Sequence, residues 1–138
     1  MKRIYVVAGL LERGSQVLLD RRKAGTHLEG LWEFPGGKRE VGETDHQALI
    51  RELAEELGVV VTEVGSKVAE VHHRYAGRDD ADPELDLTLV LYAVRWTGEP
   101  AAIEVAEVRW FERAELRTVP MPPADVPLVE AILSASNT

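Results

Sequence analysis

Hydrophobic residues occur along this chain in short runs that are separated by glycine, proline and charged positions. The runs with the length and composition of β-strands are residues 4–11, 16–20, 59–64, 67–73, 85–96 and 108–111. A short apolar stretch at 32–34 ends at Pro35-Gly36-Gly37, which is typical of a turn. The segment from 77 to 84 is polar and predicts a loop. The hydrophobic runs therefore predict a domain with several β-strands.

Helical periodicity is clearest over residues 44–57. Leu49, Leu53 and Leu57 fall on one stripe with Ile50 at its edge, so we expect this stripe to face the core. The predicted helix ends are a Thr44–Gln47 capping box and a glycine at position 58. A second helix is expected at 126–135, after a pair of prolines. Strands mixed with two helices predict an α/β fold in which a mixed β-sheet is sandwiched between helices, an α/β/α arrangement.

Composition narrows the class of protein. The 138 residues fit one domain, 1–138, with 45% hydrophobic and 29% charged residues. A net charge of -8 argues against a nucleic-acid polymer as the main partner, because binding to a phosphate backbone needs a basic surface. The absence of cysteine excludes disulfides and zinc–thiolate sites. The apolar run at 4–11 is a strand in this interpretation, not a signal peptide, and no run is long enough for a membrane span, so a cytoplasmic location is expected.

Acidic residues gather on one face of the expected helix at 44–57. Glu52, Glu55 and Glu56 stand at spacings i, i+3 and i+4, where like charges cost about 0.2–0.5 kcal/mol per pair. Arg51 relieves part of this repulsion through its i, i+4 relation to Glu55. A charge run of this kind is usually a solvated acidic face. Three oxygen donors on one rigid helix also suit a hard divalent cation such as Mg²⁺.

The residues around these glutamates carry a motif. Gly37 is followed after five residues by Glu43, and after seven more by Arg51-Glu52-Leu53-Ala54-Glu55-Glu56-Leu57-Gly58-Val59. The segment resembles the Nudix box of the Nudix hydrolases at each fixed position. The resemblance implies the Nudix fold and an attack of water on phosphorus in a derivative of a nucleoside diphosphate. It also implies Mg²⁺ as the cofactor, with Mn²⁺ as a substitute.

The same resemblance assigns roles to residues of the box. Glu52 would be a metal ligand and the general base, and Arg51 and Glu43 would orient and support the catalytic glutamates. The other metal ligands that it implies are Glu55, Glu56 and the backbone carbonyl of Gly37.

Outside the box, the chain resembles the MutT branch of the family over most of its length. Arg22 corresponds to the branch's phosphate-contacting arginine, and the segment 30–37, with Phe34, leads into the box. Glu104 stands where the branch has an acidic residue on a loop that can reach the metal, and the resemblance favours a ligand role over the alternative of a solvated loop glutamate. The implied reaction is hydrolysis of a nucleoside triphosphate to a monophosphate and pyrophosphate.

The identity of the base stays open in the sequence. Asp125 aligns with the base-recognising asparagine of MutT, and the segment 124–127 also resembles relatives that hydrolyse cytidine triphosphate. A carboxylate suits the exocyclic amine of cytosine, and an ionised Asp125 could also accept from guanine or 8-oxoguanine. Asp125 could equally be the N-cap of the last helix.

Other activities remain possible at this stage. Tyr75 lies roughly where dinucleoside polyphosphate hydrolases of the family carry a tyrosine, but a strand-end aromatic is the simpler interpretation. Substrates in this group would be a dinucleoside polyphosphate or ADP-ribose. A nucleotide-binding module without catalysis is disfavoured, because the box keeps its glutamates. The expected partner is a small nucleotide, and the sequence does not indicate an oligomeric state.

Overall fold

The computed structural model of the chain describes residues 2–26, 28–76 and 84–135, so the predicted polar loop lies outside it except for Glu84. Its β-strands are β1 (Lys2–Leu10), β2 (Glu12–Arg13), β3 (Gln16–Arg21), β4 (Trp32–Glu33), β5 (Gly36–Lys38), β6 (Val60–Tyr75), β7 (Leu85–Thr97) and β8 (Glu107–Glu112). The helices are α1 (Asp45–Leu57), a 3₁₀ helix η1 (Arg113–Thr118) and α2 (Val126–Ala135). None of the helices in these ranges is long and apolar enough to cross a membrane.

The main sheet is mixed and has the strand order β5-β1-β7-β6. β1 runs parallel to β7 along its whole length, from Lys2 opposite Leu85 to Leu10 opposite Ala93. β5 and β6 pair antiparallel with β1 and β7 at the two edges. The parallel pair at the centre of the sheet therefore joins two segments that are far apart in the sequence.

A second, antiparallel sheet is centred on β3. β2 and β4 pair with opposite ends of β3, and β8 lies along its other side. β3 is the central strand of this sheet and is buried along most of its length. Its alternating side chains enter different hydrophobic clusters: Val17 and Leu19 face one cluster, and Leu18 faces the other.

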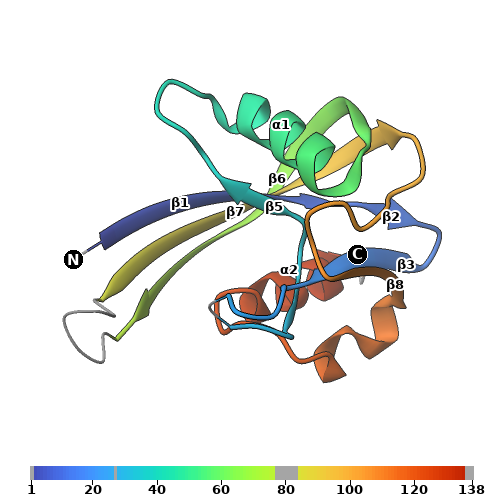
Figure 1. The fold of residues 1–138 in the computed structure, drawn as a ribbon. Helices are drawn as coiled ribbons and strands as arrows, with labels where there is room; N and C mark the ends of the chain where they lie inside the picture. Colours follow the sequence, from blue (N-terminus) through green and yellow to red (C-terminus); the bar gives the residue numbers. More distant parts are fainter. Residues whose placement is uncertain (1, 27, 77–83, 136–138) are drawn as a thin grey trace.

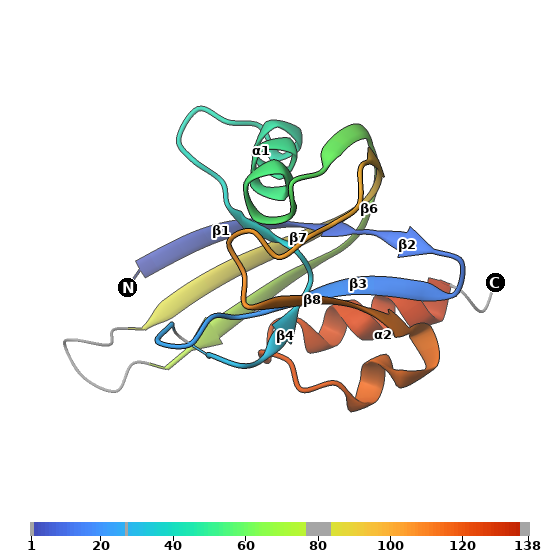
Figure 2. The same ribbon diagram turned by 45° about the vertical axis from the view of Figure 1, so that its right-hand side comes forward.

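Helices cover both faces of the main sheet. Figures 1 and 2 show α1 on one face, and α2 with the small sheet on the opposite face. The α1 layer buries Leu49, Leu53 and Leu57 against a set of sheet residues, Val7, Val90, Tyr92 and Val94. The α2 layer buries Leu128 and Ile132 in the cluster with Ala8, Leu89, Leu91 and Phe111. The predicted mixed sheet between helices is confirmed, with a small second sheet added to one layer.

Several local predictions need correction. Residues 36–38 form strand β5, not a turn, because two successive glycines let the chain lie close to β1: a Cβ on Gly36 would be 1.9 Å from the carbonyl oxygen of Val7. The two strands expected at 59–64 and 67–73 are one strand, β6, whose irregularities are shifts in its pairing with β7. Ile50 is 44% exposed and does not face the core. The 3₁₀ helix η1 was not expected.

Candidate functional site: an acidic helix beside a cavity

The ends of α1 are formed as the sequence predicts. Thr44 accepts the backbone N–H of Gln47, and the Gln47 side chain accepts the N–H of Thr44, so the capping box is complete. Gly58 closes the helix with φ = 71°, a left-handed conformation that favours glycine. Because the leucine stripe is buried, the face that carries the three glutamates is turned away from the leucine cluster.

A network around Asp45 fixes the start of α1 to the sheet. The Asp45 carboxylate accepts hydrogen bonds from the hydroxyls of Tyr5 on β1, at 2.9 Å, and Tyr92 on β7, at 2.5 Å. Arg39 pairs with the other carboxylate oxygen at 2.6 Å, and its guanidinium lies over the Tyr5 ring. Burial and Asp45 together raise the pKa of Tyr5 to about 12, so its hydroxyl stays a donor. The helix is thereby tied to two strands and to the loop before it.

Arg51 organises the acidic face. Its guanidinium donates to both oxygens of Glu43, at 2.7 and 2.8 Å, and to the carbonyl oxygen of Lys38 at 3.1 Å. It also reaches Glu52 at 2.9 Å and Glu55 at 3.3 Å. Hydrogen bonds from Arg51 lower the pKa of Glu43 to about 2, so this carboxylate stays charged. Arg51 therefore ties the loop that follows β5 to the helix, and its predicted pairing with Glu55 is confirmed.

Glu52 lies directly against the glycine strand. A Cβ added to Gly37 would be 2.2 Å from a carboxylate oxygen of Glu52, so a larger residue there would displace this carboxylate from its position. Burial raises the pKa of Glu52, and its contact with Arg51 opposes this shift. The site thus brings the backbone of β5 and the Glu52 carboxylate together, as the motif requires.

The C-terminal turn of α1 is covered by the loop between β7 and β8. Backbone N–H groups of Ile103 and Glu104 donate to the carbonyl oxygen of Glu56, and that of Ala101 donates to Leu57. The Glu104 side chain is exposed and close enough to Glu56 to raise its pKa. Burial first, and then the charge of Glu52, raise the pKa of Glu56 to about 8. Negative charge is crowded here, at the helix end where the helix dipole also disfavours it.

The oxygen atoms of the α1 glutamates and of the Gly37 carbonyl are the kind of ligand that a hard divalent cation prefers, although they do not surround one common point in this structure. In the described parts of the chain, no three carboxylate or imidazole groups stand close enough together to hold a metal ion. The residues present are nonetheless carboxylates and a backbone carbonyl, the oxygen donors that such ions prefer. Their mutual repulsion, which adds to burial in raising the pKa of Glu56, is what a bound cation relieves. The residues fit the group that the motif implies.

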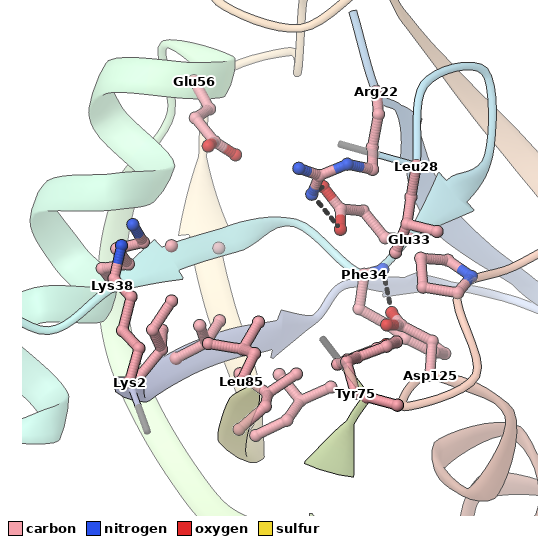
Figure 3. A pocket seen from close by; sticks show the side chains of 18 residues that line it. Lys2, Arg22, Leu28, Glu33, Phe34, Lys38, Glu56, Tyr75, Leu85 and Asp125 are labelled. Atoms are coloured by element: carbon pink, nitrogen blue, oxygen red, sulfur yellow. Dashed lines mark hydrogen bonds and ion pairs between the residues drawn. The ribbon is translucent and has the colours of Figure 1, made fainter. Parts of the chain in front are cut away.

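A cavity of about 640 Å³ opens beside the acidic helix. Its apolar floor comes from partners on β1 and β7, where Ile4 lies opposite Leu87 and Val6 opposite Leu89. The volume is in the range of small-molecule sites. Figure 3 shows Glu56 reaching the cavity from α1, with Lys2 and Lys38 on the same side of the view. The acidic face of α1 and the cavity are therefore joined through Glu56.

Arg22 and Glu33 form the polar wall opposite Glu56. Arg22 follows β3 and donates through Nη1 to both carboxylate oxygens of Glu33, at 3.1 and 3.0 Å. Burial raises the pKa of Glu33, and Arg22 opposes this shift. Arg22, the residue predicted to contact phosphate, therefore lines the cavity, and its guanidinium is paired there with Glu33.

The far end of the cavity holds Phe34, Asp125 and Tyr75. Asp125 is 5% exposed, and its Oδ2 accepts the backbone N–H of Phe34 at 3.2 Å. It precedes α2 and its backbone carbonyl accepts from Leu128, so the position is that of an N-cap, while its carboxylate points across to Phe34. Burial, and then the charge of Glu33, raise the pKa of Asp125 to about 8.

Phe34 and Tyr75, which the sequence predicts to bind the substrate, line the cavity but are largely engaged in packing and in contacts within the protein. The Phe34 ring is 3% exposed and belongs to the α2 cluster, so it forms part of the wall of the cavity and supports Asp125 through its backbone. Tyr75 ends β6, and its hydroxyl accepts the N–H of Ala124 at 3.3 Å. Both side chains line the cavity, as the sequence interpretation required.

Two acidic residues of this region were missed by sequence reasoning. Glu33 lines the cavity as the partner of Arg22, and Asp20 is buried behind it on β3. The available indications were an acid between two aromatic residues at 32–34 and an aspartate that ends an apolar strand. Neither pattern is specific without the pairing of β3 with β4.

Comparisons with known proteins converge on one family. A NUDIX domain model matches residues 6–131. The CTP pyrophosphohydrolase of Escherichia coli is 38% identical over 97% of this chain and 94% of its own length. A putative 8-oxo-dGTP diphosphatase 2 of Mycobacterium tuberculosis is 42% identical over 87% of this chain and 81% of its own. The solution structure of the E. coli ORF135 protein superposes with a TM-score of 0.79 at 39% identity, covering 99% of this chain and 92% of that one.

Proposed function

The chain belongs to the Nudix hydrolase family, and on this premise we propose that it is a Mg²⁺-dependent nucleoside triphosphate pyrophosphohydrolase that releases a monophosphate and pyrophosphate. We place its substrate among cytidine triphosphates and 8-oxo-dGTP, the nucleotides named for its relatives. The proposal treats residues 1–138 as one catalytic domain, and its cytoplasmic location stays a prediction. The main support for this proposal is that Glu56, on the acidic face of α1, also lines the cavity.

The residues that would hold the metal are Glu52, Glu55, Glu56, Glu104 and the carbonyl of Gly37. When bound, Mg²⁺ or Mn²⁺ neutralises phosphate charge and makes a coordinated water more acidic. Glu52 is the general base in this proposal: it takes the proton from the attacking water. Support comes from its position against the β5 backbone and from its hydrogen bond to Arg51, which limits where the carboxylate can lie.

The remaining residues orient the nucleotide. Arg22 contacts the phosphates, opposite Glu56 in the cavity (Figure 3). Asp125 reads the base at the far end, where Phe34 and Tyr75 form the walls. Arg51 and Glu43 keep the acidic face in place through a bidentate ion pair, which is more restrictive than a single contact. Phosphoryl chemistry of this kind relies on positioning and charge neutralisation.

A nucleotide panel tests the proposal. CTP, dCTP, dGTP, 8-oxo-dGTP, ADP-ribose and a dinucleoside polyphosphate are incubated with the protein in Mg²⁺, Mn²⁺ or chelator, and pyrophosphate and phosphate are measured separately. We expect pyrophosphate from one of the triphosphates, only with the metal. Turnover confined to ADP-ribose or the dinucleotide contradicts the substrate class. Binding of nucleotides without any turnover indicates a non-catalytic module.

A further inference from the structure

Asp20 is a buried acid whose carboxylate has no hydrogen-bond partner in the part of the chain that the structure describes. The residue is 1% exposed. An unsatisfied buried polar group is destabilising, and an ionised one far more so. Burial first, and then the charges of Glu33 and Glu56, raise the pKa of Asp20 to about 9. At neutral pH the side chain is therefore a carboxylic acid that carries a proton to donate.

The position of Asp20 on β3 places it behind the polar wall of the cavity. It is the direct cross-strand partner of Glu33 on β4 and of Val108 on β8. Side chains opposite each other in an antiparallel pair share a face, with Cβ atoms about 4.5–5.5 Å apart. Leu18 and Arg22 stand on the same face by alternation, so Asp20 lies between an apolar neighbour and the Arg22–Glu33 pair.

Negative charges on three other segments act on Asp20 and raise its pKa. They are Glu33 on β4, Glu56 on α1 and Asp125 before α2. The positive charge of Arg22, two residues along from Asp20, lowers this pKa, and Arg22 donates to Glu33. Among the described residues, Arg22 thus lies near several carboxyl groups, and it pairs with Glu33.

We propose that Asp20 is a positioning residue: it stays protonated and donates a hydrogen bond to Glu33 when Arg22 turns from Glu33 to the phosphates of the nucleotide. The inference rests on the proposed function, because it takes Arg22 as the phosphate contact. Without a second donor, Glu33 would be left as a half-buried carboxylate with its counter-ion withdrawn. Asp20 lies across from it with a proton, so Arg22 can engage the substrate while Glu33 keeps its place in the cavity.

Three variants separate this role from simple packing. Asp20→Asn keeps a neutral donor of the same shape, and we expect its kcat/KM to stay within about twofold of the wild type. Asp20→Ala removes the donor, and we expect kcat/KM to fall about tenfold or more, the effect of one hydrogen bond to a charged group. In the Glu33→Gln background the Asp20→Ala change should lose most of its effect, because the neutral amide does not need the donor.

Two controls separate the loss of the hydrogen bond from a loss of packing volume or of stability. Val108→Ala removes volume beside Asp20 on the same face without touching Glu33, so its activity should stay near that of the wild type. The melting temperature of Asp20→Ala should equal or exceed that of the wild type, since an unsatisfied buried group is lost. Equal losses of kcat/KM in Asp20→Ala and Val108→Ala would make Asp20 a packing residue and overturn the proposal.

An infrared measurement tests the inference independently of turnover. The difference spectrum between wild type and Asp20→Asn at neutral pH should contain the C=O band of a protonated carboxylic acid, and that band should shift to lower frequency when a nucleotide binds with Mg²⁺. Absence of the band, or a band unmoved by bound nucleotide, contradicts the inference even if the enzyme is active. Weakened Mg²⁺ binding in Asp20→Asn would instead make Asp20 a metal ligand. A shifting band in a protein that hydrolyses none of the panel leaves the inference standing and refutes the proposed function.

Discussion

The Glu52 carboxylate is partly buried, which disfavours its negative charge, and its position is restricted by its neighbours. Its pKa is raised by burial, and it is confined between Arg51 and the backbone of Gly37. We expect Glu52→Gln to lower turnover by at least about 10²-fold, since it removes the general base and a metal ligand. Its metal-free stability should match the wild type, because one repulsive charge is removed together with one ion pair. Steady-state kinetics and thermal melts measure the two effects.

A matched control for this variant is Glu63→Gln, a glutamate on β6 whose side chain is exposed and pairs with Arg95. It should keep normal turnover. Near-normal turnover in Glu52→Gln would contradict the assignment of the base, and a large drop in its melting temperature would identify the residue as structural.

Asp125 is the residue where specificity should be decided. Asp125→Asn retains an acceptor for the N–H of Phe34, whereas Asp125→Ala leaves that buried donor unpaired. We expect Asp125→Ala to lower kcat/KM for the preferred base about ten- to a hundredfold more than for other triphosphates. Asp125→Asn should change the order of preference among cytidine, guanosine and 8-oxoguanosine triphosphates. If every triphosphate falls equally, or only in step with stability, then Asp125 supports the fold alone.

The site residues differ in how far the sequence could reveal them. Glu52, Arg51 and Gly37 belong to one continuous segment with fixed spacing, so a single stretch of chain determines their geometry. Asp20 and Glu33 meet only because β3 pairs with β4 in one register, which no local spacing encodes. The same holds for the direction of the Asp125 side chain, because a residue before a helix can cap it or reach elsewhere.

At the scale of elements, the two glycines of β5 contact different parts of the molecule. A Cβ on Gly37 would collide with the Glu52 carboxylate, whereas one on Gly36 would collide with the backbone of Val7. We expect Gly37→Ala to lower turnover about a hundredfold with the fold intact, since small displacements of catalytic groups have effects of this size. Gly36→Ala should destabilise the protein by roughly 1–3 kcal/mol. Kinetics and denaturation of the two variants give the comparison, and equal loss of stability in both would contradict it.

The prediction of elements succeeded where caps and periodicity agree. α1 carries its own end markers, Thr44, Gln47 and Gly58, so its bounds follow from local chemistry. Paired glycines usually mark a turn, so the sequence predicts one at residues 36–37, and only the pairing with β1 makes this segment a strand. Gly65-Ser66 predicts a break between two strands, and the structure has a shift in register there within the single strand β6. The mixed sheet between helices, by contrast, followed from the alternation of strand and helix patterns.

At the scale of the whole molecule, charge should govern metal binding. The chain has a net charge of -8, and its acidic helix faces the cavity that the substrate would enter. We expect Mg²⁺ to stabilise the protein by about 2.7 kcal/mol at a hundredfold excess over its dissociation constant. Nucleotide affinity should fall in chelator. Titration calorimetry that detects no Mg²⁺ binding, with equal nucleotide affinity in chelator, would contradict this expectation.

The buried acids should also make stability depend on pH. Asp20 and Asp125 keep their protons in the folded protein up to pH values of about 9 and 8, whereas an unfolded aspartate releases its proton near pH 3.8. The unfolded state therefore binds fewer protons in this window, and the free energy of unfolding should fall as the pH rises from about 4 to 9. Denaturant melts of the metal-free protein at pH 5, 7 and 9 measure this, and Asp20→Asn should show a smaller decline. Equal slopes for the two proteins would contradict the contribution of Asp20.

The parallel pairing of β1 with β7 has a consequence for how the protein is made. The leucine face of α1 is complete once residue 57 has been synthesised, but its partners Val90, Tyr92 and Val94 belong to β7. The centre of the sheet closes only when Lys2–Leu10 meets Leu85–Thr97, and β3 waits still longer for β8. Contacts this distant in sequence slow folding and leave apolar surface exposed on a growing chain. A nascent chain that stalls before β7 would therefore carry the complete acidic motif on a helix that still lacks its β7 partners.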